Sequence, residues 1–441
     1  MAGRQGRSLA VVLTACMAVL AALPAAATPG DVVWAVVSDE SGERDQLAAS
    51  ALSSDGARLF VTGTSGKPKS ADFRTIAYDA RTGSQLWATT YDRGARDRAE
   101  AIAVASDESA LYVTGASKGV DTGSDYATVA YEAASGSQLW EAAYQQRRAD
   151  VPSCIAVSPD GSTVLVTGDS ESRRSSADWV TVAYDATTGA RLWRHSYTTP
   201  RVDRPQGCST TEDGSALVVT GFTYNVMSPE GVPDAVTISY SVATGDELWR
   251  DRYDGRNGWD EGTDVAVGPD GVFVSGISNV GSNPDPLVLA YAPTGSLRWK
   301  RRFPSGGSWE DATNLAVAPD GASIYLTGEG GTMPTVAYDA SSGARRWARR
   351  VGETLGWAEG EAIAVAPDGM TVYIAGWRYG EGDDGALTYA LDALTGQTVW
   401  QDLSHPGSAW SVVAPPSGAT VLVSGDTYVD SLDFQTVAYE A

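Results

Sequence analysis

One eleven-residue phrase returns along this chain at a nearly constant interval. At residues 183–193 it reads AYDATTGARLW, and similar phrases occur throughout the sequence. Eight tryptophans share this register at spacings of 48 to 56 residues: Trp34, Trp87, Trp140, Trp193, Trp249, Trp299, Trp347 and Trp400. Such a period indicates a chain of equivalent units, each of which buries its apolar face only against its neighbours.

Each unit is predicted to hold four antiparallel strands. In the third unit the first strand reads CIAVSPDG (154–161) and ends in a Pro-Asp-Gly turn, followed by STVLVTG (162–168), DWVTVAYD (178–185) and ARLWRHSY (190–197). Alternation of apolar and polar residues, with many β-branched and aromatic side chains, is typical of strands, and the Pro and Gly positions suit a tight turn. Four strands in about 40–50 residues are typical of a propeller blade.

The two ends of the chain complement each other. After a leader, the sequence starts with TPGDVVW (28–34), a fourth strand without a third, and it ends with DFQTVAYEA (433–441), a third strand without a fourth. We therefore predict an all-β fold, an eight-bladed β-propeller of four-stranded antiparallel blades spanning residues 28–441. The N-terminal strand is expected to join the C-terminal blade and close the ring without an open edge.

Residues 1–27 have the features of a secretory signal peptide. Two arginines precede an apolar run, which is followed by Pro24 and the small residues Ala25, Ala26 and Ala27. We expect cleavage near Thr28 and a secreted, extracytoplasmic protein. Cys16 lies in a stretch resembling a lipoprotein signal, but the apolar run before it is short and lipidation is not our expectation. No other stretch is apolar enough to span a bilayer.

Charge narrows the classes of partner. The formal net charge is −23, and such a surface would repel a polyanionic duplex, so we expect no nucleic-acid binding. Apolar residues make up 43% of the chain and charged residues 20%, which is compatible with a large folded core.

The recurring phrase resembles the tryptophan-docking motif of PQQ-like repeats, found in eight-bladed quinoprotein dehydrogenases. The flanking segments resemble SBBP-type propeller repeats of secreted bacterial proteins. This resemblance covers residues 28–441 and implies that each tryptophan locks one blade to the next. PQQ-like rings without a cofactor also serve as scaffolds in outer-membrane protein assembly.

The catalytic features of quinoprotein enzymes are not matched by this sequence. The alcohol dehydrogenases carry adjacent active-site cysteines, whereas Cys154 and Cys208 are 54 residues apart, and the two histidines, His195 and His405, are interpreted as surface residues. We expect no cofactor, although PQQ with calcium stays open as a minority alternative, with Glu261, Asp264 and Asn314 as conceivable calcium ligands.

Function is expected in departures from the average blade rather than in features repeated eight times. The aspartates that open the third strands and the glycines that end the second strands are therefore assigned to turns and packing. The connections between blades, and between second and third strands, vary most in length, so their shared face is the candidate binding surface.

A column of tryptophans precedes the first strands of units five to seven, at Trp259, Trp309 and Trp357, and Trp377 maps to the same face. Acidic residues follow, including Asp260 and Glu310. The corresponding stretches of units one to four are basic, with Arg44, Arg96 and Arg148. First strands line the axis of a propeller, so these nine residues are our candidate binding residues. Packing between blades and solvated charge would also account for them.

We interpret the protein as a monomeric binding or scaffold module whose ligand docks over this face. A saccharide fits the indole faces and carboxylates, and an envelope protein is the other candidate partner. A PQQ-dependent oxidoreductase or a carbohydrate-active enzyme using paired carboxylates stays open, but no catalytic or metal-binding residue can be selected.

Cys154 and Cys208 occupy neighbouring units at positions of opposite parity along their strands. Their side chains therefore point to opposite faces of their blades, as a bridge between adjacent blades requires. The direction is not fixed by parity, so a disulfide and two thiols that face apart both remain open.

Overall fold

The computed structural model describes residues 28–38, 44–67, 69–118, 123–146, 148–171, 177–224, 231–255, 258–279, 284–303, 311–352, 357–380, 384–428 and 432–441. Residues 1–27, the expected signal peptide with Cys16, lie outside this range, as do Trp309 and Glu310. No helix within the described residues is long and apolar enough to cross a membrane.

The described residues form eight four-stranded sheets, one for each blade. The bounds of the strands in blades 1 to 4 are, in chain order, β2 (Asp45–Leu52), β3 (Arg58–Ser65), β4 (Asp72–Asp79), β5 (Gln85–Tyr91); β6 (Asp97–Val104), β7 (Ala110–Lys118), β8 (Ser124–Glu132), β9 (Gln138–Tyr144); β10 (Asp150–Val157), β11 (Thr163–Ser170), β12 (Asp178–Asp185), β13 (Arg191–Tyr197); β14 (Asp203–Thr210), β15 (Ala216–Tyr224), β16 (Pro233–Ser241) and β17 (Glu247–Tyr253).

Blades 5 to 7 follow the same order, and blade 8 takes its fourth strand from the start of the chain. Their strands are β18 (Asp260–Gly268), β19 (Gly271–Asn279), β20 (Pro284–Tyr291), β21 (Leu297–Arg302); β22 (Asn314–Val317), β23 (Ser323–Thr327), β24 (Met333–Asp339), β25 (Arg345–Val351); β26 (Trp357–Val365), β27 (Thr371–Tyr379), β28 (Gly385–Asp392), β29 (Thr398–Asp402); β30 (Ser408–Val413), β31 (Thr420–Thr427), β32 (Asp433–Glu440) and β1 (Val32–Ser38).

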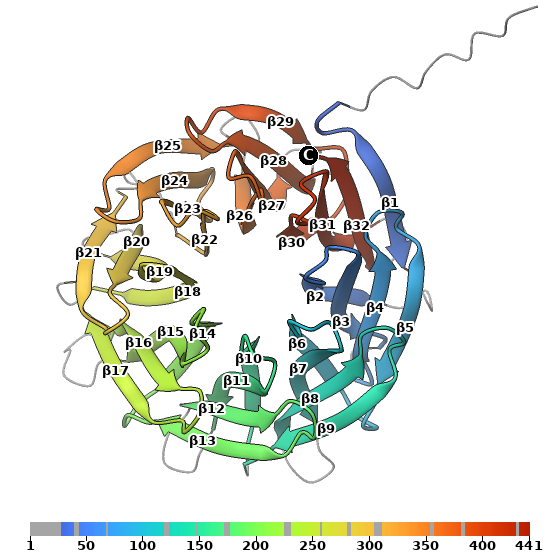
Figure 1. Cartoon of the computed structure of the whole chain (residues 1–441), viewed down its shortest axis with the longest axis vertical. Coiled ribbons are helices and arrows are strands. Elements are labelled where there is room, and N and C mark those ends of the chain that lie inside the picture. Colours follow the sequence, from blue (N-terminus) through green and yellow to red (C-terminus); the bar gives the residue numbers. More distant parts are fainter. Residues whose placement is uncertain are drawn as a thin grey trace, which may run out of the picture.

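The sheets stand around a common axis as a closed ring (Figure 1). The first strand of each blade lies nearest the axis and the fourth forms the rim. β1 pairs antiparallel with β32, so the first described strand of the chain completes the blade built by the last three. This confirms the predicted eight-bladed propeller and the way in which it closes.

The repeated tryptophans lock each blade to the next. Seven of them donate their indole N–H to a backbone carbonyl in the following blade, over distances from 2.7 Å at Trp193 to 3.2 Å at Trp34. The glycine of the repeated T-G or S-G turn packs against the indole ring of the preceding blade. A Cβ on Gly189 would lie 2.7 Å from the Trp140 ring. Trp400 packs in the same way on Gly30, in the turn that precedes the N-terminal strand β1.

A second repeated feature lies near the axis. In seven blades the register between the first two strands shifts by one residue, as at Pro152/Cys154, which indicates a β-bulge. Opposite the first strand, a glycine of the second strand leaves no room for a side chain, since a Cβ on Gly168 would lie 2.3 Å from the carbonyl oxygen of Val151. In seven blades this glycine lies inside the second strand and not at its end, as Gly168 does in β11 (Thr163–Ser170), because the strand continues past it. Close packing therefore explains this glycine column.

Two faces of the ring differ in their connections. The turn face carries the hairpins between first and second strands and between third and fourth strands. The loop face carries the connections between blades and between second and third strands. The terms turn face and loop face are used in this sense below.

Candidate functional site

The candidate residues gather on the loop face, at the ends of strands near the axis. Trp259 and Trp357 stand at the starts of β18 and β26, with 43% and 44% of their surface exposed. Trp377 lies on β27 and is half-buried. Arg44, Arg96 and Arg148 precede β2, β6 and β10 and are exposed. The structure thus places indoles on blades 5 and 7 and arginines on blades 1 to 3.

Trp259, Trp357 and Trp377, the candidate tryptophans that the structure describes, are each hydrogen-bonded to a carboxylate of their own blade. The indole N–H of Trp377 donates to Oε1 of Glu361 over 3.1 Å, and that of Trp357 donates to Glu359. Trp259 is hydrogen-bonded to Glu261.

In blade 8, Trp410 likewise donates to Oδ2 of Asp426 over 2.8 Å. These pairs orient the rings and also satisfy carboxylates that lie close to the axis. The sequence places acidic residues, among them Glu261, Glu359 and Glu361, directly after these tryptophans, but it does not by itself predict the hydrogen bonds between them.

Blades 6 and 7 bring two of these carboxylates together with a third, that of Glu329. Oxygens of Glu329, Glu359 and Glu361 lie within 4.8 Å of one another. Burial raises the pKa of Glu329 to about 7, and repulsion from Glu361, Glu359 and Asp311 adds to the rise. Burial likewise raises the pKa of Glu261 to about 7, opposed by the hydrogen bond from Trp259. We call the cluster of Glu329, Glu359 and Glu361 the acidic arc. Glu329 in the arc and Glu261 beside Trp259 therefore both change charge near neutral pH.

On the part of the loop face formed by blades 1 to 4, some of the arginine charges are neutralised by ion pairs with neighbouring carboxylates. Arg204 pairs with Asp169 over 2.9 Å, linking blades 4 and 3, and Arg98 pairs with Glu100 beside it. Burial raises the pKa of Glu100, and the Arg98 charge opposes that rise.

Asp260 has a structural position rather than one open to a ligand. It is fully buried, and its Oδ2 accepts a hydrogen bond of 2.6 Å from the backbone N–H of Gly255 in the preceding loop. Asp150 and Asp203 make the same bond to the N–H of Gln146 and of Thr199, each at 2.5 Å. An aspartate at the start of an inner strand therefore caps the loop between two blades.

Two further acidic clusters repeat one arrangement at two junctions between blades. Asp72, Asp92 and Asp97 come together in one, and Asp234, Asp254 and Asp260 in the other. In the second cluster Arg252 neutralises Asp234 through an ion pair. Carboxylates in this number could hold a divalent cation, but acidic clusters of this kind are also common without one.

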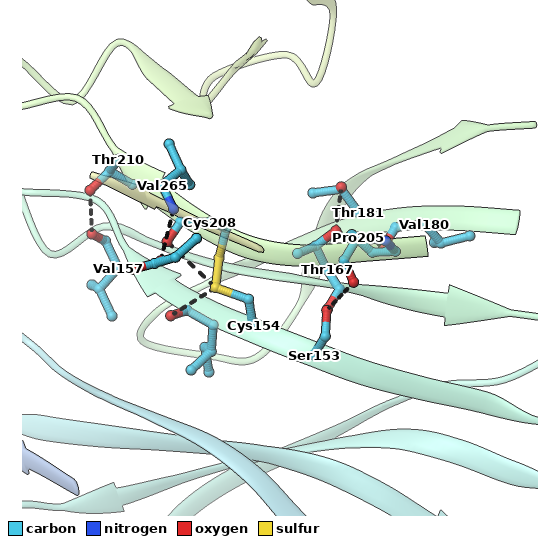
Figure 2. The surroundings of a disulfide bond; sticks show 12 residues. Ser153, Cys154, Val157, Thr167, Val180, Thr181, Pro205, Cys208, Thr210 and Val265 are labelled. Atoms are coloured by element: carbon cyan, nitrogen blue, oxygen red, sulfur yellow. Dashed lines mark hydrogen bonds between the residues drawn. A yellow bond between two sulfur atoms is a disulfide. The ribbon is translucent and has the colours of Figure 1, made fainter. Parts of the chain in front are cut away.

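The two cysteines lie in inner strands of neighbouring blades and form a disulfide. Cys154 on β10 and Cys208 on β14 have their Cα atoms 5.9 Å apart (Figure 2). Two hydrogen bonds join the same strands, from Ser153 Oγ to the carbonyl of Pro205 at 3.1 Å and from Thr210 Oγ1 to that of Val157 at 3.4 Å.

The histidines differ from the expectation of ordinary surface residues, because both are partly buried. The ring of His195 packs on Tyr240 at 4.8 Å between centroids, and Nε2 of His405 lies 3.2 Å from Asp402.

The loop face fits a PQQ-like cofactor poorly. A flat tricarboxylate would meet the acidic arc of Glu329, Glu359 and Glu361, while Arg98 and Arg204 are already paired with acids. Like charges at such short range oppose binding.

Comparison with known proteins places this architecture in a family. A model described as the outer membrane protein assembly factor BamB matches residues 18–230 and 233–441. The chain belongs to this BamB family. The match confirms the PQQ-like repeat. No curated protein matches the sequence.

Solved structures share the fold of this BamB-family chain at low sequence identity. BamB from Moraxella catarrhalis is 13% identical with a TM-score of 0.53, over 93% of this chain and 97% of that one. Sqt1 from Chaetomium thermophilum is 14% identical with a TM-score of 0.62, over 93% and 98%. The C-terminal WD40 domain of Sif2 is 10% identical with a TM-score of 0.60, over 94% and 99%. At such identities the likeness shows the fold alone.

Proposed function

We propose that this protein is an exported, non-catalytic binding scaffold whose protein partner docks on the loop face around the axis of the ring. The observation that carries this proposal is the pair of exposed indoles, Trp259 and Trp357, each held by a carboxylate beside the acidic arc. Aromatic anchors on a rigid frame are typical of binding hot spots.

Family and fold support a scaffold role. The family is named for an assembly factor, and one Sqt1 propeller of the same fold was solved bound to the N-terminus of the ribosomal protein L10. The Cys154–Cys208 disulfide suits an oxidising compartment and agrees with export through the signal peptide expected at residues 1–27.

The chemistry of the face favours a protein segment that presents apolar and basic side chains. Such a segment would pack on the indoles and place its cations against Glu329, Glu359 and Glu361. An envelope protein is the partner we propose, without a cofactor and without a catalytic residue on this chain. A saccharide stacking on the indoles is the alternative that the test separates.

Site-specific photo-cross-linking in the producing cell tests the proposal. Benzoylphenylalanine replaces Trp357 in the full chain, and in a control it replaces Leu139, which is 53% exposed on the outer strand β9. We expect one discrete protein adduct from position 357 and a much lower yield from position 139. Equal yields at both positions, or binding of the purified protein to glycans but to no protein, would overturn the proposal.

A further inference from the structure

A cavity of about 420 Å³ opens on the turn face between blades 4 and 5, opposite the face discussed above. Its volume lies in the range of ligand sites, roughly 300–1,000 Å³. Strand residues from both blades and the turns of both blades line it.

One departure from the repeat creates the inner part of the cavity. In each blade, three residues that pair across the second, third and fourth strands form a row. The residue on the fourth strand is the docking tryptophan. In five blades this row starts with an aromatic residue packed on that tryptophan, with ring centroids 5.7 to 6.2 Å apart. In blade 4 the row reads Val218, Ser239, Trp249.

Val218 is the smallest residue at its position, since the remaining two blades have Leu165 and Leu422 there. In the middle of the row, Ser239 replaces an alanine found in the other seven blades, as at Ala183 in blade 3. The smaller side chain leaves space beside Trp249, and Ser239 adds a hydroxyl to the lining.

A second departure opens the cavity to the surface. At most junctions the first hairpins of adjacent blades touch, so that a Cβ on Gly214 would lie 3.3 Å from Pro159, and one on Gly321 would lie 3.1 Å from Pro269. Blade 4 carries Glu212 where those turns have proline, and this residue is exposed at the rim.

The hairpin of blade 5 is also shorter than its counterparts. Gly268 pairs directly with Gly271, whereas the turn of blade 3 closes between Ser158 and Thr163. The nearest atoms to a Cβ on Gly271 belong to Tyr291 and Arg298 of its own blade. The turn therefore does not reach across to blade 4, and the junction stays open.

The lining is apolar inside and acidic at one edge. Val218, Trp249, Val267, Val272, Pro269 and Pro293 provide the apolar walls. Glu212 and Asp213 stand exposed on the blade 4 turn, and Thr211 and Ser215 hydroxyls donate to Asp213 at 2.6 and 2.8 Å. The carboxylate is thus held in place, and none of the described residues that line the cavity is basic.

We infer that this cavity is a second binding site, which takes a peptide segment of a partner protein. The segment inserts one bulky apolar side chain beside Trp249 and sets an adjacent lysine or arginine against Glu212 and Asp213. Charge complementarity argues for this occupant, because the rim is acidic and the whole chain carries a net charge of −23. The site does not depend on the loop face.

Two tetrapeptides test the inference with the full chain. Acetylated and amidated Gly-Trp-Lys-Gly and Gly-Trp-Glu-Gly, both made with 5-fluorotryptophan, are titrated while fluorine NMR line broadening is measured. We expect the lysine peptide to bind about fivefold more tightly than the glutamate peptide, the scale of an exposed ion pair. No broadening with either peptide, or equal broadening with both, would overturn the inference.

Variants locate the binding. Val218→Phe restores the aromatic residue of the other blades, so it should abolish broadening without lowering the melting temperature. Glu212→Lys, on the exposed turn, sets a cation beside the remaining carboxylate of Asp213, so it should abolish the preference for the lysine peptide even if Val218→Phe folds poorly. Trp357→Ala removes an indole of the loop face, which is also proposed to take apolar and basic side chains. The preference for the lysine peptide should persist in this variant, which separates this site from the proposed function. Unchanged binding in Val218→Phe and Glu212→Lys would refute the cavity as the site.

Discussion

Ala35, in the first described strand, lies opposite Val437 in the last strand of the chain. Their strands, β1 and β32, complete one sheet, and through it the ring is held shut by pairing between segments some 400 residues apart in sequence. β1 also packs its half-buried Trp34 and Val36 against the core between blades 8 and 1.

Weakening this closure should destabilise the whole ring. Val36→Pro removes a backbone N–H in the middle of β1 and should lower the melting temperature, because proline disrupts strand pairing. Val37→Thr, at a side chain 52% exposed on the same strand, should have little effect. Thermal unfolding by circular dichroism checks the pair, and similar melting temperatures for both variants would mean that β1 contributes little to closure.

Two glycine substitutions separate the free energy lost by disturbing a docking tryptophan from the free energy lost by straining the turn backbone. Gly189 has φ of +70°, and a Cβ there would lie 2.7 Å from the Trp140 ring. Gly161 has φ of +71°, but its nearest atom would be 3.8 Å away.

Gly161→Ala should therefore cost about 1–2 kcal/mol of unfolding free energy, from the left-handed backbone alone. Gly189→Ala should cost clearly more, because the new methyl group also displaces the indole. Urea denaturation of both variants gives the comparison, and equal losses would indicate that the indole moves aside freely.

The disulfide should contribute strongly to stability. It closes a loop with a sequence separation of 54, and the chain-entropy relation gives about 4 kcal/mol for a loop of that size. The double variant Cys154→Ser, Cys208→Ser should lose unfolding free energy on that scale. Dithiothreitol should destabilise the natural protein but leave the double variant unaffected. If dithiothreitol has the same effect on both, the bond is not the source of the stability.

Stability should fall as the pH rises from about 5.5 to 8. The carboxyls of Glu261 and Glu329 have a pKa raised to about 7 by burial, against an ordinary value of 4.5. A carboxyl that holds its proton more tightly when folded contributes stability that is complete below its ordinary pKa. That contribution is lost as the pH passes the raised value, so the melting temperature should drop by a few degrees over this interval.

Removing these two carboxyls should flatten the pH profile. Glu261→Gln with Glu329→Gln should reduce the dependence between pH 5.5 and 8, whereas Asp320→Asn, on an exposed turn, should not. Turn aspartates such as Asp79, whose pKa is lowered by hydrogen bonds from Thr82, act in the opposite sense, but only at more acidic pH. An unchanged slope in the double variant would contradict this assignment.

The sequence alone determined the architecture of this protein, because the sequence pattern of one blade recurs eight times along the chain. The register of Trp34 to Trp400 specified one blade after another, and the unmatched strands at residues 28–34 and 433–441 specified how the ring closes. Such features are local or periodic, so they do not require knowledge of which residues meet across space.

Contacts between blades were decided only by the tertiary structure. Parity allowed Cys154 and Cys208 to face each other or to face apart, and only their placement on adjacent inner strands brings them together. The raised pKa of Glu261 and Glu329 arises from burial and from neighbours in other strands, which a list of acidic residues cannot supply.

The cavity beside Trp249 has the same origin. Val218 and the short turn at Gly268–Gly271 are visible as departures in the sequence, but they belong to different blades. Only the packing of blade 4 against blade 5 brings the small side chain of Val218 and the short hairpin of blade 5 to one junction. Together they leave a cavity there, which neither feature would indicate alone.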